Sequence, residues 1–150
     1  MQEKVVFDTN VYIGIFSKGL YTSEINWFNK ITYLVHPVLH ELWMGAKGKS
    51  EIRHMIRFGN TFVKLGRLVQ PKPATQIKIG RACQKLRSIG KFDTGNRGQY
   101  NDVCIALLAA QIGATVVTLD INDFKRIQSV VDFKFRNVME EESGLSRKKR

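Results

Sequence analysis

Short apolar runs recur along the chain and are separated by longer amphipathic stretches. Residues 5–7 and 115–119 are apolar runs without a charged side chain, a pattern typical of buried strands. Residues 33–35 form a third run, and residues 133–136 alternate between aromatic and basic, which predicts an edge strand. Because helical stretches lie between these runs, the pattern predicts an α/β fold, a three-layer α/β/α sandwich around a central parallel sheet.

Apolar residues at helical spacing fill the intervals between the runs. They predict helices over residues 10–16, 22–31, 52–66, 78–86, 101–112 and 122–128, and one more that begins at Pro37. The helices at 52–66 and 78–86 each have an apolar face and a basic face, and we expect them to form a hairpin around the break at 70–73. Residues 90–98 are expected to form a loop, and Gly113 to end the helix that follows it.

The length and charge of the chain indicate how many domains it has and what kind of partner it binds. The chain has 150 residues, so we expect one domain over residues 1–139. Residues 140–150 are charged and hold few apolar side chains, which predicts a disordered tail. The net charge of +11 predicts an anionic partner, either nucleic acid or an acidic protein segment. The large aromatic residues expected in the core are Trp27, Phe28, Trp43 and Phe124.

The cysteines and the N-terminal residues do not indicate export or a membrane. Cys83 and Cys104 lie in apolar helical segments without CxxC spacing, which argues against a disulfide framework or a zinc site. A charged residue already stands at position 8, which leaves no room for an apolar signal segment before it. The most apolar stretch, 103–119, is interrupted by Gln111 and Gly113. We therefore expect a cytoplasmic protein that does not cross a membrane.

Five of the thirteen acidic residues fall where apolar segments end or helices begin. They are Asp8, Glu41, Asp102, Asp120 and Asp123. In an open parallel sheet, strand ends and helix starts meet at one edge, where ligands bind. Close carboxylates repel one another unless a cation or protons compensate, and Mg²⁺ and Mn²⁺ prefer oxygen ligands. The pattern therefore predicts a metal site.

Two other interpretations of these residues compete with that site. An Asp at the start of a helix is often only a cap, which would account for Asp102 or Asp123 taken singly. Capping does not account for Asp8, which directly follows a buried run. His36 and His40 have the four-residue spacing of zinc-binding helices, although Pro37 predicts that His36 precedes its helix.

Three segments, in order, resemble the PIN-domain ribonucleases, and among them the VapC toxins of type II toxin–antitoxin systems. The segments are Asp8-Thr-Asn-Val, His40-Glu41-Leu42, and the stretch that begins Asn101-Asp102-Val-Cys-Ile-Ala-Leu-Leu-Ala and ends Asp120-Ile-Asn-Asp123-Phe124. The resemblance extends from Asp8 to about Val138, nearly the whole chain. The third segment is its most specific part.

The resemblance implies a Mg²⁺- or Mn²⁺-dependent endoribonuclease with a PIN-like fold. It implies that a water attacks the RNA phosphodiester and leaves a 5′-phosphate and a 3′-hydroxyl. The implied catalytic residues and metal ligands are Asp8, Glu41, Asp102 and Asp120, supported by Thr9, Asn10 and Thr118. Many VapC relatives have Asn in place of Asp120 and an acid in place of Asp123, whereas this chain has both acids. We favour Asp120 as the fourth ligand because it directly follows the strand, and Asp123 remains a candidate.

Partners also follow from the resemblance, which implies a homodimer and a cognate antitoxin that blocks the acidic site. A surface for RNA or a partner is predicted at Arg53, Arg57, Lys78 and Arg81, on the basic faces of the two middle helices. Two alternatives to a toxin are a PIN nuclease that processes RNA and a non-catalytic module that binds nucleic acid. A non-catalytic module is expected to lack some of the acids, and none is missing here.

Overall fold

The computed structural model describes residues 2–21, 24 and 30–138, and these contain a single five-stranded sheet. The strands are β1 (Glu3–Phe7), β2 (Lys30–Val35), β3 (Leu68–Val69), β4 (Thr115–Thr118) and β5 (Lys134–Asn137). Their order is β3-β2-β1-β4-β5, and all neighbouring strands are parallel. The predicted tail at 140–150 lies outside the described residues.

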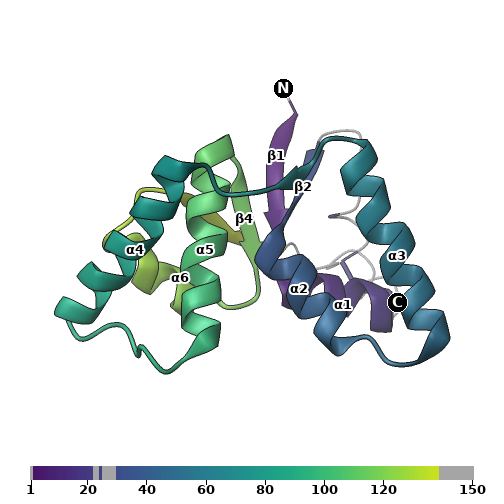
Figure 1. Ribbon diagram of the computed structural model, residues 1–150, viewed down its shortest axis with the longest axis horizontal. Coiled ribbons are helices and arrows are strands. Elements are labelled where there is room, and N and C mark those ends of the chain that lie inside the picture. Colours follow the sequence, from purple (N-terminus) through teal and green to yellow (C-terminus); the bar gives the residue numbers. More distant parts are fainter. Residues whose placement is uncertain (1, 22–23, 25–29, 139–150) are drawn as a thin grey trace, which may run out of the picture.

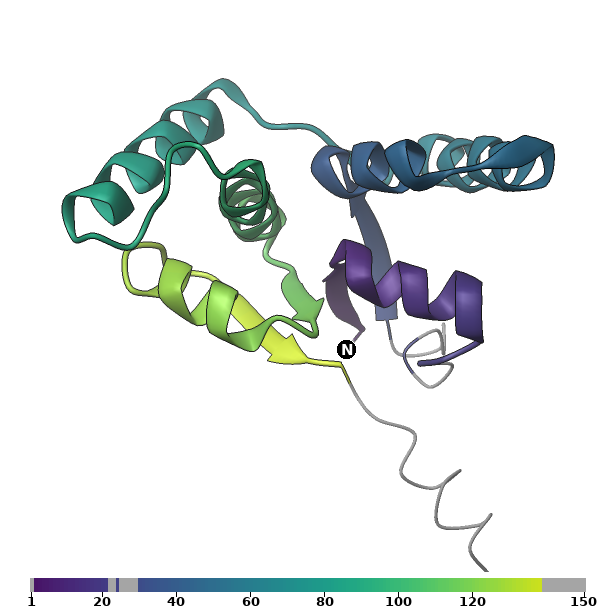
Figure 2. The same ribbon diagram turned by 90° about the horizontal axis from the view of Figure 1, so that it is seen from below.

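Helices cover both faces of the sheet, as Figures 1 and 2 show. The helices are α1 (Thr9–Lys18), α2 (His36–Gly45), α3 (Gly48–Lys64), α4 (Pro73–Ser88), α5 (Arg97–Ile112) and α6 (Ile121–Gln128). The first three lie on one side of the sheet and the last three on the other (Figure 1). This arrangement follows from right-handed crossovers between parallel strands. The predicted three-layer α/β/α sandwich with a parallel sheet is confirmed.

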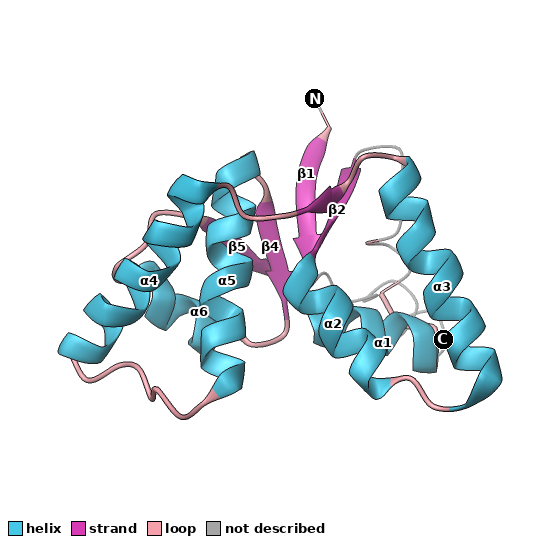
Figure 3. Ribbon diagram, in the orientation of Figure 1, coloured by secondary structure: helices cyan, strands magenta, loops and turns pink. Residues whose placement is uncertain are grey.

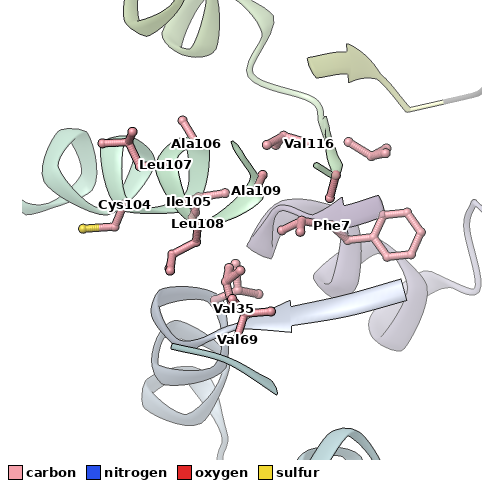
Figure 4. Close-up of a cluster of buried hydrophobic side chains, with 14 of the residues drawn as sticks. Phe7, Val35, Val69, Cys104, Ile105, Ala106, Leu107, Leu108, Ala109 and Val116 are labelled. Atoms are coloured by element: carbon pink, nitrogen blue, oxygen red, sulfur yellow. The ribbon is translucent and has the colours of Figure 1, made fainter. Parts of the chain in front are cut away.

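Helix α5 forms the centre of the core. Every side chain from Val103 to Ala109 is buried, because the helix packs against α4 and α6 and contacts four strands of the sheet. Figure 4 shows this cluster between the sheet and the helix. Gly113 ends α5 with a φ of 68°, a left-handed conformation that glycine adopts without strain.

Aromatic burial was predicted correctly for one residue. Phe124 is fully buried, whereas Trp43 is 38% exposed because α2 presents only Pro37, Val38 and Leu42 to the core. Trp27 and Phe28 lie outside the described residues.

Several helix boundaries differ from those predicted. The helix expected at 22–31 is wrong at its end, since Lys30 and Ile31 pair with β1 as the start of β2; most of its other residues are not described. Helix α2 begins at His36, so Pro37 is its second residue. Helix α5 begins four residues earlier than expected, because Asn96 caps it by accepting a hydrogen bond from the backbone N–H of Gln99.

The predicted hairpin of the two middle helices is wrong. Leu68 and Val69 form β3, which pairs with the end of β2, so the chain crosses to the other face before α4 begins. Figure 3 shows α3 and α4 on opposite sides of the strands. The apolar face of α3 is also only partly buried: Met55 and Phe62 are in the core, whereas Ile52, Ile56 and Val63 are exposed.

Two further features concern thiols and membranes. Cys83 and Cys104 are both free thiols. In the described part of the chain, no helix has the length and apolar character needed to cross a bilayer.

Candidate active site

The five acids predicted from the sequence line one cleft at the carboxyl edge of the sheet. Asp8 follows β1 and Asp120 follows β4, while Glu41, Asp102 and Asp123 lie on α2, α5 and α6. The cleft has a volume of about 380 Å³. The other residues that line it are Thr9, Asn10, Ile13, Asn96, Gly98 and Gln99. The parallel topology therefore brings together acids that are dispersed along the chain.

Asp8 is held rigidly at the junction of β1 and α1. Its side chain is 5% exposed, and its backbone N–H donates to Val117 O at 2.9 Å. Asp8 Oδ1 accepts from the N–H of Thr9 at 2.8 Å, and Oδ2 accepts from the Thr118 hydroxyl at 2.7 Å. The carboxylate is thus the N-cap of α1, so the expectation that capping does not account for Asp8 is wrong. It is also fixed to β4 through Thr118.

The predicted supporting residues join Asp8 to Asp120. The hydroxyl of Thr118, which is fully buried, accepts from the N–H of Asp120 at 2.9 Å while it donates to Asp8. Asn10 Nδ2 donates to Asp120 Oδ2 at 3.0 Å. These contacts orient two carboxylates from neighbouring strands toward the same cleft.

Glu41 and Asp102 face the cleft from two helices. Asp102 is the sixth residue of α5, which excludes the N-cap interpretation for it. Asn101 Nδ2 donates to Glu41 Oε1 at 3.3 Å, so α5 also positions the acid of α2. Asp123 does lie in the first turn of α6, where it forms an exposed ion pair of 3.5 Å with Arg126.

Burial and mutual repulsion raise the pKa values of two carboxyls in the metal-free protein. Burial is the main cause that raises the pKa of Asp102 to about 8, and the charges of Asp8, Asp123, Asp120 and Glu41 add to it. Burial also raises the pKa of Asp8 to about 6, against the opposing hydrogen bonds from Thr118 and Thr9. Because Asp102 responds to all four other acids, the five carboxyls form one electrostatic cluster.

The donor set fits a hard divalent cation, although the side chains do not form a closed coordination shell. Within residues 2–21, 24 and 30–138, no three Asp, Glu, His or Cys side chains form a group that could hold a metal ion as they stand. Mg²⁺ commonly takes one or two protein carboxylates and completes its octahedron with water and substrate phosphate. Thr9 Oγ1 and Asn10 Oδ1 are buried without a hydrogen-bond partner among the described residues. Both residues line the cleft, so these two oxygens are available to a ligand bound there.

Five lining or supporting residues were not among the predicted site residues: Ile13, Asn96, Gly98, Gln99 and Asn101. The spacing Asn96-x-x-Gln99 is a capping signal that could have placed the start of α5 and brought two of them to the cleft. No local signal identifies the contact between Asn101 and Glu41, which are 60 positions apart.

The histidine pair does not form a metal site. His36 and His40 both lie on α2 with ring centroids 5.5 Å apart, so the expectation that His36 precedes the helix is wrong by one residue. A tetrahedral zinc site needs three or four protein ligands, and among the described residues no third His, Cys, Asp or Glu joins the pair.

The four predicted basic residues do not form one surface. Arg53 and Arg57 lie on α3, whereas Lys78 and Arg81 lie on α4, on the other side of the sheet (Figure 1). None of the four lines the acidic cleft.

Sequence comparison finds no matching family model and no matching curated protein. Solved structures do match the fold. One chain of the DNA-bound VapBC structure from Salmonella typhimurium superposes with a TM-score of 0.68 at 21% identity, over 92% of this chain and 100% of that chain. VapBC2 from Rickettsia felis, bound to a promoter DNA fragment, gives 0.66 at 24% identity, over 89% and 98%.

A similar match is found to FitAcB from Neisseria gonorrhoeae, with a TM-score of 0.67 at 21% identity over 89% of this chain and 96% of that chain. The TM-scores establish a shared fold, although the sequences are at most 24% identical. The likeness spans about nine-tenths of this chain in each case. The chain therefore has the PIN-like α/β fold of the VapC structures.

Proposed function

We propose that the chain is a Mg²⁺- or Mn²⁺-dependent endoribonuclease that acts as the toxin of a VapBC-type toxin–antitoxin pair. The observation that carries this proposal is the cluster of five carboxyls in one cleft of a PIN-like fold. Burial, and then the charges of the other four acids, raise the pKa of Asp102 in this cluster. Asp8, Glu41, Asp102 and Asp120 are the proposed catalytic residues. A cytoplasmic location agrees with this role.

The chemistry proposed for the cleft follows from its side chains. A bound divalent cation would orient a water and stabilise the charge that develops on the phosphate. The residues that would hold it are the five acids, with Asp8 fixed in orientation by Thr118 and Glu41 by Asn101. Without the cation, the same carboxylates would repel the RNA backbone. The cluster therefore suits an anionic substrate that binds when the divalent cation is also bound.

Cleavage of RNA by the purified full chain is the direct test. We expect cuts in total RNA with Mg²⁺ or Mn²⁺, products with 5′-phosphate ends, and no cuts with EDTA. Asp102→Asn is expected to lower the cleavage rate at least about 1000-fold, since it removes a charge from the metal cluster. Glu3→Gln, which removes an exposed carboxylate that lies outside the cleft, is the control and should cleave normally. Cleavage that persists with EDTA or in Asp102→Asn rejects the mechanism.

The fourth ligand can be identified by metal affinity. Asp120 follows β4, and after burial its charge adds to the raised pKa of both Asp8 and Asp102. The charge of Asp123 also adds to the raised pKa of Asp102, but Asp123 is engaged with Arg126. We expect Asp120→Asn to weaken Mn²⁺ binding about tenfold or more in calorimetry, and Asp123→Asn to weaken it less than about threefold. Affinity equal to the wild type in the first variant would exclude Asp120.

An antitoxin and a homodimer are the proposed protein partners. A groove of about 650 Å³ between α1, α2 and α3 is lined mainly by apolar residues and shares Ile13 and Glu41 with the acidic cleft. A segment bound in this groove would extend into the cleft and block it. The exposed apolar residues of α3, Ile52, Ile56 and Val63, offer surface for a second copy. A monomeric mass in light scattering would contradict the dimer.

A further inference from the structure

The positive charge of this protein is concentrated in one segment. Residues 52–92 contain ten Lys and Arg residues and no Asp or Glu, a contribution of +10 to the net charge of +11. This segment forms most of α3, then β3 and α4. The cations are therefore divided between the two faces of the sheet, and only some of them can serve any one ligand.

Three cations of α4 come together in a second cleft, which we call the α4 cleft. It has a volume of about 400 Å³ and is lined by Lys78, Arg81 and Lys85 from α4 and by Val130, Val131 and Asp132 from the turn after α6. Positions 78, 81 and 85 are three and four apart, so they share one face of the helix. That face lies next to the buried stripe of α4, which brings the cations over the turn.

The cations of the α4 cleft are available for a ligand. All three side chains are exposed, and in the described part of the chain none of them forms an ion pair. Asp132 lines the same cleft, is exposed and forms no ion pair either. Three positive charges and one negative charge leave a net attraction for an anion.

The α4 cleft lies at the opposite end of α6 from the acidic cleft. Asp123, in the first turn of α6, lines the acidic cleft, and Val130, two residues beyond the last turn, lines the α4 cleft. The eight residues of α6 span about 12 Å at 1.5 Å per residue. If the RNA keeps the rise of about 3.4 Å that one strand has in a stacked duplex, that length corresponds to about four nucleotides.

Without its cation, the acidic cleft supplies no affinity for RNA, because its carboxylates repel phosphates. Attraction for the RNA must come from a cationic surface that the same RNA strand can reach. The basic residues of α3 line neither cleft, and the sheet separates them from the α4 cleft. We propose that the α4 cleft binds the phosphate backbone of single-stranded RNA about four nucleotides from the cut site. This inference rests on the proposed ribonuclease function.

The test measures binding without cleavage. Fluorescence anisotropy in EDTA would compare a labelled 12-nucleotide single-stranded RNA on the wild type, on the triple variant Lys78→Gln/Arg81→Gln/Lys85→Gln and on Arg53→Gln/Arg57→Gln/Lys64→Gln. The last variant removes the same charge from α3 and is the matched control. All six positions are exposed, and circular dichroism would verify that both variants are folded.

We expect the α4 variant to bind the RNA about 10- to 100-fold more weakly than the wild type. The slope of log affinity against log salt concentration should also fall by up to about 2, because each phosphate contact contributes about 0.7 to this slope for single strands. The α3 variant should stay within about threefold of the wild type.

Three results would overturn the proposal: no binding of RNA by the wild type, an equal loss in both variants, or an α4 cleft that prefers a poly-glutamate peptide to RNA at equal charge. The result is independent of catalysis. Cleavage that fails in the wild type while the α4 variant still loses RNA affinity would reject the ribonuclease and retain the binding site.

Discussion

Asp102→Asn is expected to stabilise the metal-free protein at pH 8 and to remove most of its stabilisation by Mn²⁺. The pKa of Asp102 rises from an ordinary 3.8 to about 8 in the folded protein, first through burial and then through the charges of the other acids. The neutral carboxyl therefore favours the folded state below about pH 4, and this contribution is lost as the pH rises through about 8. Asp8, with its pKa raised to about 6, adds to the loss between pH 4 and 6.

The size of this effect can be measured by thermal unfolding. With EDTA at pH 8, Asn at position 102 should add about 2 to 4 kcal/mol to the free energy of unfolding, or roughly 5 to 15 °C in Tm. At pH 4 the variant and the wild type should unfold at similar temperatures. Excess Mn²⁺ at 100 times its Kd should add about 2.7 kcal/mol to the wild type and much less to the variant. An equal gain in Tm at both pH values would mean that packing, not charge, explains it.

Glu24→Gln is expected to lower the free energy of unfolding by about 3 kcal/mol or more. The Glu24 side chain is fully buried and accepts from Lys30 Nζ at 2.7 Å and from two Arg136 nitrogens at 2.7 and 2.9 Å. Removing one member of a buried ion pair typically costs about 3 to 5 kcal/mol, because the charge that remains is uncompensated. Here the Lys30 side chain, only 8% exposed, would lose that carboxylate.

A control for this prediction lies in the same network. Glu3 contacts Arg136 at 3.2 Å but is 41% exposed, so Glu3→Gln should cost less than about 1 kcal/mol. Urea unfolding of both variants would measure the difference. Replacing Glu24, Lys30 and Arg136 together with Leu, Met and Leu should recover much of the stability, since no buried charge is left. Equal costs for the Glu24 and Glu3 variants would show that burial does not govern this network.

Sequence patterns located the features that depend on local chemistry. Apolar runs placed β1 and β4, Gly113 placed the end of α5, and the position of acids after those strands placed the cluster of carboxyls at the carboxyl edge. These succeed because strand burial, left-handed helix ends and parallel topology each have a short-range signature.

The remaining features depend on contacts between distant residues. The two-residue β3 has almost no periodicity of its own and exists because β2 offers an edge to Leu68 and Val69. Because the sequence pattern does not reveal β3, it predicts that the two middle helices form a hairpin with a single basic surface, and both predictions are wrong. The exposure of Trp43 likewise depends on which face of α2 meets the core. The bond from Asn101 to Glu41 joins residues on different helices and cannot be inferred from spacing.

The hydrogen bond between Thr118 and Asp8 joins residues 110 positions apart. Contacts between such distant positions form late in folding, because the intervening chain must first be ordered. A chain still being synthesised would expose β1 and its carboxylate long before β4 emerges to orient it. The acidic cleft would therefore not be assembled until residues 115–123 have emerged from the ribosome.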